Sequence, residues 1–220
     1  MKQRNEEDPM SSDTTKKKIL EVATRLFSVY GYDSTTTRMI ASEAGVNVAT
    51  IAFHFENKET LYRIVREQGV EEFEAYFSST LTKVENVIAD ASASEEDVLD
   101  AIELLLEKMM DIALSSSFSE LINLIFWEQV HNTGDDLIIS NTAITHCEKP
   151  LANLLVKYAP SLPFEQAVMI SRLVLGGIIS YNQYPVLLSD LKEKYKGESL
   201  NDYIRSTLTP FIMNSIQSYL

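Results

Sequence analysis

Few side chains in the sequence are spaced for catalysis. The most suggestive pair is Glu128 and His131, because a Glu-x-x-His spacing places two metal ligands on one face of a helix. Di-iron helical proteins need a second such pair and two further glutamates, whereas this chain has only three histidines and no second Glu-x-x-His. A lone pair is more often an ordinary surface or pocket feature. We therefore expect no metal site and no cofactor.

Signatures of other enzyme classes and of membrane insertion are also missing from the sequence. It contains no glycine-rich phosphate loop and no nucleophile elbow. The single cysteine, Cys147, can form neither an intramolecular disulfide nor a CxxC metal site, which suits a reducing compartment. No signal-peptide pattern opens the chain, and no apolar run approaches the roughly 18 residues that span a bilayer. We expect a cytoplasmic protein that is not an enzyme and has no membrane partner.

Side chains suited to reading DNA gather instead around one glycine. Gly45 separates two short stretches with helical spacing, and glycine tolerates the positive φ that such a turn needs. The second helix of a helix-turn-helix contacts the major groove through its N-terminal residues. Those residues are Asn47, Val48, Ala49 and Thr50. A generic three-helix packing unit would show the same pattern, so the pattern alone leaves both interpretations open.

The rest of the chain predicts an all-α fold. Glycine and proline are scarce, at 7 and 6 residues, and no segment alternates as a strand does. We expect a disordered tail over residues 1–13, a helix-turn-helix domain over 14–62 and a larger helical domain over 63–220. Expected helix caps are Thr35 or Thr36, Asn47, Asn57 and Ser94. Gly31 is expected to end the first helix. Further expected helices cover residues 48–55, 164–184 and 137–158, the last of them bent or interrupted at Pro150.

Charge is distributed unevenly along the chain. The whole sequence carries a formal charge of −13, which taken alone argues against a nucleic-acid binder. Residues 1–68, however, hold 10 basic and 10 acidic residues, whereas residues 69–220 hold 9 and 22. Residues 14–55 are mildly basic. Such asymmetry indicates distinct partners for the two parts.

The full string of residues 14–62 is more specific than the turn alone. Its features are TKKKIL at 15–20, Ala23, LF at 26–27, GY at 31–32, TTTRMIA at 35–41, AGVN at 44–47 and HFENKETLY at 54–62. This string resembles the N-terminal domain of the TetR family of bacterial transcriptional regulators (TetR/AcrR-like). The remaining residues match only as a larger all-helical domain that ends in two apolar helices.

The resemblance implies a set of DNA-contacting residues. Family members contact phosphate at the threonine that caps the second helix, read bases from the third helix, and anchor phosphates with an aromatic residue and a lysine. The implied set here is Thr36, Thr37, Arg38, Asn47, Val48, Ala49, Thr50, Phe53, His54 and Lys58.

This chain departs from the family pattern at two positions. Forms of the family carry tyrosine at position 52 or 53, where this sequence has Ala52 and Phe53. A phenylalanine can pack on a sugar or belong partly to the core, but it has no hydroxyl for a phosphate. His54 either contacts a phosphate or packs beneath the helix. Lys16 to Lys18 either contact the DNA backbone or form a solvated face.

The resemblance further implies that the C-terminal domain senses a ligand and forms a homodimer. Residues 164–184 and 199–220 are independently too apolar to leave a face in water without a partner, although both helices could instead bury into their own domain. The expected interface residues are Leu173, Gly176, Gly177, Ser180, Leu208, Phe211, Ile212 and Ile216.

Polar or soft residues within apolar segments are the candidates for lining a ligand pocket. They are Met109, Met110, Asn123, Trp127, His131, His146, Tyr181 and Tyr184, and for each one core packing is the alternative. The expected function is that of a ligand-responsive regulator, usually a repressor in this family. It would bind a near-palindromic double-stranded DNA operator as a homodimer and be released by a small-molecule effector. The alternative is a helical interaction or metal-binding protein whose helix-turn-helix is purely structural.

Overall fold

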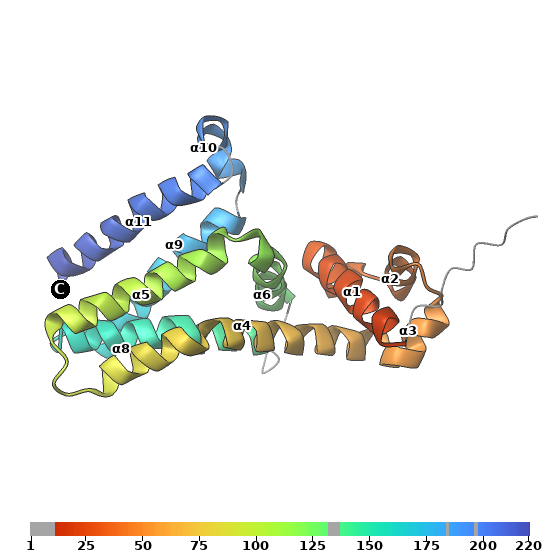
Figure 1. Cartoon of the computed structure of the whole chain (residues 1–220), viewed down its shortest axis with the longest axis horizontal. Coiled ribbons are helices and arrows are strands. Elements are labelled where there is room, and N and C mark those ends of the chain that lie inside the picture. The colour runs from red at the N-terminus through yellow and green to blue at the C-terminus, as the bar shows by residue number, and fades with distance from the viewer. Residues whose placement is uncertain (1–11, 132–136, 184, 196–197) are drawn as a thin grey trace, which may run out of the picture. The chain divides into compact units, whose positions relative to one another are not determined.

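The computed structural model describes residues 12–131, 137–183, 185–195 and 198–220, and all regular structure in these ranges is helical (Figure 1). The all-α prediction is confirmed. The elements are α1 (Ser12–Ser34), α2 (Thr37–Ala44), α3 (Val48–Phe55), α4 (Lys58–Ala89), α5 (Glu95–Leu114), η1 (Ser116–Phe118), α6 (Ser119–His131), α7 (Ile138–Ala143), η2 (Ile144–Glu148), α8 (Lys149–Tyr158), α9 (Phe164–Gln183), η3 (Pro185–Leu188), α10 (Ser189–Lys194) and α11 (Glu198–Tyr219).

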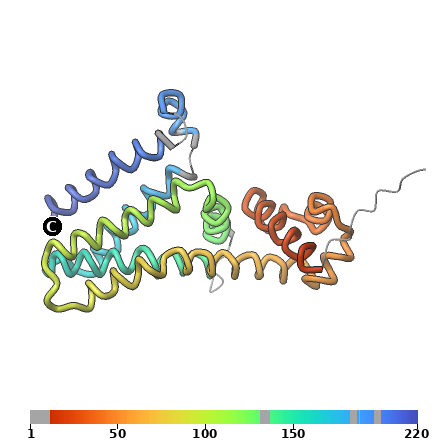
Figure 2. Tube along the Cα trace, viewed as in Figure 1, coloured from red at the N-terminus to blue at the C-terminus, as the bar shows by residue number. Residues whose placement is uncertain are grey.

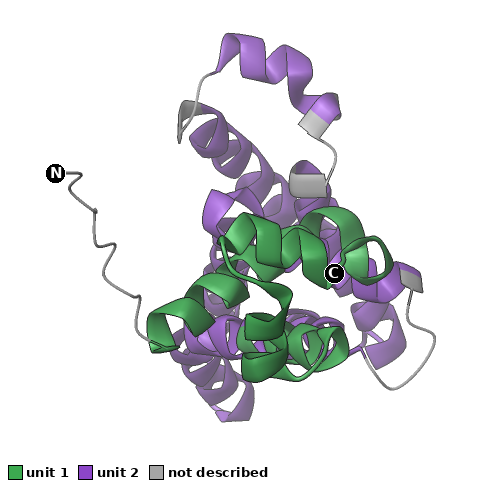
Figure 3. Ribbon diagram, turned by 90° about the vertical axis from the view of Figure 1, so that its right-hand side faces the viewer, with its two compact units in different colours: residues 1–68 green, residues 69–220 purple. Residues whose placement is uncertain are grey.

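The chain divides into two compact units, residues 1–68 and residues 69–220 (Figure 3). The division falls inside α4, the helix that also contains the boundary predicted after residue 62. Most of the predicted disordered tail lies outside the described residues. Ser12 and Asp13, however, form the first turn of α1 and are helical.

Unit 1 is built by α1, α2, α3 and the start of α4 around a small core. Its largest fully buried side chains are Ile19, Phe27, Ile40, Ile51, Phe55 and Leu61. Gly31, predicted to end the first helix, leaves the helical conformation with φ 73° and ψ 174°, after which the chain makes one further turn to Ser34. Thr35 is buried just beyond it, and its hydroxyl donates to the carbonyls of Gly31 (2.8 Å) and Leu26 (3.1 Å).

Unit 2 has its core where α5, α8 and α9 pack against one another, and α11 packs along α5. The Cα trace shows α8 running beside α5 (Figure 2). The capping box predicted at Ser94 is present, because its hydroxyl accepts from the Asp97 N–H while the Asp97 carboxylate accepts from the Ser94 N–H. The Ser94 hydroxyl also donates to Asp97 Oδ2 (2.6 Å), and this bond, followed by the one from the Ser94 N–H, lowers the pKa of the Asp97 carboxyl.

The segment predicted as one helix over 137–158, interrupted at Pro150, is more finely divided. It comprises α7, a π-helical turn (η2) and α8, and Pro150 lies in the first turn of α8. Proline has no N–H to donate to the preceding turn, so a break just before it is expected. The π-turn carries Glu148, which is 4% exposed.

Glu128, singled out for its spacing from His131, binds the start of α7. Its buried carboxylate accepts from the N–H of Ser140 (2.9 Å), the hydroxyl of Ser140 (3.0 Å) and, more weakly, the N–H of Ile139 (3.4 Å). A carboxylate at a helix N-terminus is favourable because the amides there lack partners. The side chain of His131 lies outside the described residues. In the described part of the chain, no group of three or more His, Cys, Asp or Glu is placed to hold a metal.

Among the described helices, none is by itself both long and apolar enough to cross a bilayer. Residues 95–114 and 116–130 meet that criterion only when taken together, and they are bent by 73° at the break between them.

Candidate functional site

The turn between α2 and α3 has the hydrogen bonds of a well-formed helix-turn-helix. Thr36 caps α2, since its hydroxyl accepts from the Met39 N–H (3.2 Å). Gly45 ends the helix in the left-handed region, at φ 70° and ψ 33°, and the Val46 N–H returns to the Ala41 carbonyl (2.9 Å). A side chain at this φ would be strained, so the glycine allows the chain to turn at once into α3.

Helix α3 has one buried and one exposed face. Ile51 and Phe55 are each 1% exposed and hold the helix in the unit 1 core. The N-cap is Asn47, whose Oδ1 accepts from the N–H (2.8 Å) and the hydroxyl (3.0 Å) of Thr50. The residues predicted to contact DNA on this helix therefore lie on the solvent side: Asn47, Val48, Ala49 and Phe53 are exposed and Thr50 is half-buried.

Phe53 and His54 were each given two interpretations by the sequence. Phe53 is 80% exposed, so it is not a core residue and its ring is available for a ligand. His54 is half-buried and meets the Phe53 ring edge-on, at 5.1 Å between centroids. The imidazole also lies near the buried Phe55 ring, at 6.1 Å between centroids, so it borders both the exposed face and the core.

Lys58, implied to anchor a phosphate, lies at the end of α1. Its Nζ donates to the carbonyls of Tyr32 (2.8 Å) and Thr35 (3.0 Å) and stands 4.0 Å above the Tyr32 ring. The ammonium therefore fixes the connection between α1 and α2. An ammonium has three donors, so one more bond remains for a phosphate.

The connection between α3 and α4 is strained. Glu56 has φ 64° and ψ −60°, and the Asn57 N–H donates to the Phe55 carbonyl (2.7 Å), which is the geometry of a γ-turn. Asn57 then caps α4 as predicted, its Oδ1 accepting from the Thr60 N–H (2.8 Å). The tight turn sets the direction of α3 relative to the first turn of α4.

Basic side chains accompany the exposed face of unit 1. Arg38 on α2 and the run from Lys16 to Lys18 on α1 are exposed, and Thr37 beside Arg38 is half-buried. The Lys18 Nζ lies 3.7 Å from the point where a Cβ on Gly45 would stand. The second turn of α1 therefore brings a positive charge to the turn of the helix-turn-helix.

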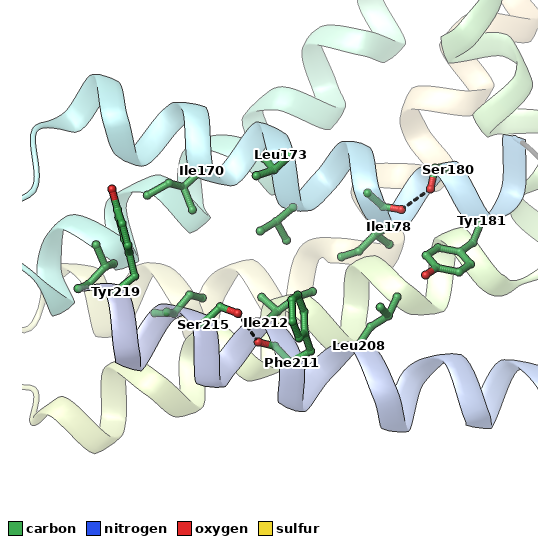
Figure 4. A pocket seen from close by; sticks show the side chains of 14 residues that line it. Ile170, Leu173, Ile178, Ser180, Tyr181, Leu208, Phe211, Ile212, Ser215 and Tyr219 are labelled. Carbon is green, nitrogen blue, oxygen red and sulfur yellow. Dashed lines mark hydrogen bonds between the residues drawn. The ribbon is translucent and has the colours of Figure 1, made fainter.

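Unit 2 contains a long apolar groove between α9 and α11, with a volume of about 590 Å³ (Figure 4). Three large side chains lining it are mostly in water: Leu173 is 76% exposed, Phe211 68% and Tyr219 77%. The two serine hydroxyls that line it each donate within their own helix, Ser180 to the Gly177 carbonyl and Ser215 to the Phe211 carbonyl. The groove is consequently apolar over most of its length.

Seven of the eight residues predicted for the dimer interface line this groove: Leu173, Gly177, Ser180, Leu208, Phe211, Ile212 and Ile216. Gly176 lies instead in a second hollow, which Ser180 also lines. The adjacent glycines thus serve two different surfaces of α9.

The second hollow is a cleft of about 540 Å³ bounded by α6, the α7–η2 segment and α9. A bidentate ion pair lies in its wall, because Arg172 donates from Nε to Glu148 Oε2 (2.7 Å) and from Nη2 to Oε1 (2.8 Å). The sequence did not predict this Arg172–Glu148 pair. Arg172 is the only basic residue in the apolar stretch 164–184, and that isolation is the signal that could have found it.

The predicted ligand-pocket residues are not gathered around one hollow. Tyr181 lines the groove between α9 and α11. Met109 and Met110 are buried in the core, and Asn123, Trp127 and His146 are half-buried but line neither hollow. Tyr184 and the side chain of His131 lie outside the described residues.

Comparisons with known proteins place the helix-turn-helix in a family. Residues 19–65 match the model of the bacterial regulatory proteins of the tetR family. The chain is 39% identical over 83 residues to the probable HTH-type transcriptional regulator YttP of Bacillus subtilis. It is 42% identical over 48 residues to IcaR of Staphylococcus epidermidis, a negative transcriptional regulator of a biofilm operon. These alignments cover 38% and 22% of this chain, and 38% and 26% of the two relatives, respectively.

The whole fold has counterparts among solved structures. The structure of AibR in complex with isovaleryl coenzyme A and operator DNA is similar over 89% of this chain and 98% of that one, with a TM-score of 0.61 and 18% identity. At that identity the likeness concerns the fold, and the match of the N-terminal residues carries the relationship. The helix-turn-helix at residues 19–65 therefore matches that of the tetR family of bacterial regulatory proteins, and the chain as a whole shares the fold of AibR.

Proposed function

We propose that this chain is a ligand-responsive transcriptional repressor that binds a near-palindromic operator as a homodimer. One observation carries the proposal: the described part of unit 1 buries one face of α3 and leaves the other in water, with a phenylalanine 80% exposed beside an exposed N-cap asparagine. A ring this exposed contributes little to the core of unit 1 and is available to pack on DNA.

The contacts on DNA follow from the side chains on that face. Asn47 and Thr50 supply the hydrogen-bonding groups for base edges, and Ala49 leaves room for the duplex to approach. Phe53 packs on a sugar. Arg38, Lys18 and the spare donor of Lys58 meet phosphates. A role on DNA agrees with two similar proteins, since IcaR is a negative transcriptional regulator and AibR was solved with operator DNA.

Dimerisation is supported by the groove between α9 and α11. An apolar surface with Leu173, Phe211 and Tyr219 largely in water is covered at least cost by the same surface of a second copy. Two-fold symmetry then sets two α3 helices about 34–36 Å apart, one turn of DNA, and selects an operator with matching half-sites. A small molecule that binds one arrangement of the dimer better shifts the population away from the DNA-binding one.

Selection of bound sequences from a random DNA pool tests the proposal. A palindromic consensus is expected, and Thr50→Ala should weaken binding to it by about 1–3 kcal/mol, with a smaller loss on unrelated DNA. Thr50 is the sharper choice, because Asn47→Ala would also remove the cap of α3. Thr50→Ala keeps the bond from its backbone N–H to Asn47.

Val29→Ala is the matched control, since Val29 is a 54% exposed apolar residue of unit 1 that lies on α1 and not on α2 or α3. It should leave operator affinity unchanged. Specific binding should also fall steeply with salt as counterions return to the DNA. A pool that yields no consensus would favour the alternative of a structural helix-turn-helix.

A further inference from the structure

We infer that the cleft between α6, the α7–η2 segment and α9 binds an amphipathic organic acid, with its carboxylate at Arg172 and its apolar body along α6 and α9. The role of this ligand as the effector rests on the proposed function. Its binding does not, because binding to the cleft can be measured without DNA.

The walls of the cleft are suited to an apolar body. Ile122 and Ile125 of α6 are 2% and 8% exposed and form a packed floor, while Leu175 and Ile179 of α9 line the facing wall. Phe126, 43% exposed, stands at the edge. At about 540 Å³ the hollow has the size of a small-molecule site.

At the polar end of the cleft, the negative charge of Glu148 is buried and the positive charge of Arg172 is exposed. The Glu148 side chain is 5% exposed, whereas the Arg172 side chain bound to it is 67% exposed. The two parallel hydrogen bonds fix the guanidinium plane and raise the pKa of Arg172 above its ordinary value. A guanidinium has five N–H donors, of which Glu148 uses two. The remaining three suit a carboxylate, which can accept two of them in parallel.

Among the other polar side chains of the cleft, Gln129 is uncharged and the two serine hydroxyls are already engaged. The Ser140 hydroxyl already donates to Glu128 (3.0 Å), and the Ser180 hydroxyl donates to the Gly177 carbonyl (2.6 Å). A cationic ligand would have to displace Arg172 from a buried carboxylate, which is costly because the desolvated Glu148 charge depends on that bond. The chemistry therefore favours an acid over an amine of the same length.

The π-turn and a glycine shape the site. Ile144 and Glu148 are the first and last residues of η2, and both line the cleft. On α9, a Cβ at Gly176 would meet no atom within 4 Å. The absence of a side chain at this position therefore leaves open space in the cleft. Widened π-turns of this kind frequently occur at functional sites.

Titration calorimetry of the full chain with octanoate, octanol and octylammonium tests the inference. Octanoate should bind saturably and more tightly than both of the others. The double variant E148Q/R172Q removes both charges without leaving a buried carboxylate unpaired. It should reduce octanoate affinity about tenfold to a hundredfold, as expected for the loss of charge-assisted hydrogen bonds, while octanol binding changes little.

Gly176→Leu supplies a second, charge-independent test. The added side chain fills the cleft, so it should abolish octanoate binding, whereas Gln166→Leu, at an exposed position of the same helix that lines neither hollow, should retain it. Circular dichroism confirms that both variants fold. Equal affinity for the three probes, preference for octylammonium, no binding, or octanoate binding that survives Gly176→Leu would each overturn the inference. If octanoate binds as expected but leaves operator affinity unchanged, only the effector role fails.

Discussion

The two units of this chain differ in what they leave exposed. Unit 1 completes a small core, and its exposed large apolar side chains are few: in the described residues, Val29 and Tyr30 on α1, and Val48 and Phe53 on α3. Unit 2 leaves Leu173, Phe211 and Tyr219 exposed along one groove. Unit 1 exposes polar and basic side chains such as Asn47 and Arg38 beside its few apolar ones, whereas the exposed side chains of the unit 2 groove suit another apolar surface.

Charge separates the two units in the same way. The formal charge of −13 belongs entirely to residues 69–220, while residues 1–68 are neutral with basic side chains beside α3. An acidic unit repels a phosphate backbone and limits non-specific contact with it. The net charge of the whole chain is therefore a poor guide to nucleic-acid binding, whereas the distribution of charge along the chain is informative.

The largest effect is expected from a charge in the groove of unit 2. Leu173→Glu or Phe211→Glu would bury an unpaired carboxylate in the proposed dimer interface, which should weaken association about a hundredfold or more. Light scattering should then give the monomer mass of 24.8 kDa where the parent chain gives twice that value. Gln217→Glu adds the same charge to an exposed position of α11 outside the groove and should remain dimeric. A monomeric parent chain would contradict the model.

The features predicted correctly from sequence are those set by short-range contacts. Thr36, Asn47, Asn57 and Ser94 cap helices as expected, because each cap binds a backbone N–H three residues along the chain. The bounds of α3 and α9 also agree closely with the expected ranges. A local bond depends only on local residues, so one sequence suffices to place it.

The features that were missed depend on distant partners. Two of them join residues 23 or more positions apart: Arg172 pairs with Glu148, and Lys58 binds the end of α1. The third, the π-turn at 144–148, follows from how the helices pack. The γ-turn at Glu56 has positive φ without a glycine, so no residue type predicts it. The spacing of residues along one sequence does not predict contacts between distant segments.

A moderate effect is expected from removing a local cap in unit 1. Thr36→Ala leaves the Met39 N–H without its side-chain acceptor and should lower the free energy of unfolding by about 1 kcal/mol. Thr37→Ala, one position inside the helix, is the control and should change stability by less. Urea unfolding of both variants measures the difference. Equal losses would mean that the cap of α2 adds nothing to the stability of unit 1.

The smallest effect is expected at high pH in unit 2. Burial, followed by the charge of Asp111 and a hydrogen bond to it, raises the pKa of Tyr76 from 10.0 to about 12. The Tyr76 hydroxyl donates to Asp111 Oδ2 (3.1 Å), and Asp111 also binds Arg205 of α11. The Tyr76–Asp111 bond therefore links α4 to α5, and the Asp111–Arg205 ion pair links α5 to α11, which lines the groove.

The sign of the pH effect follows from the raised pKa. The folded state favours the protonated phenol, so its contribution to stability is fully present below pH 10 and is lost as the pH rises toward about 12. Tyr76→Phe should lose stability at neutral pH but show a shallower decline over that interval than the parent chain, measured by urea unfolding at each pH. Burial also raises the pKa of Tyr32 in unit 1, so Tyr32→Phe should likewise show a shallower decline than the parent chain. Parallel curves for Tyr76→Phe and the parent would mean that the bond to Asp111 does not couple α4 to α5.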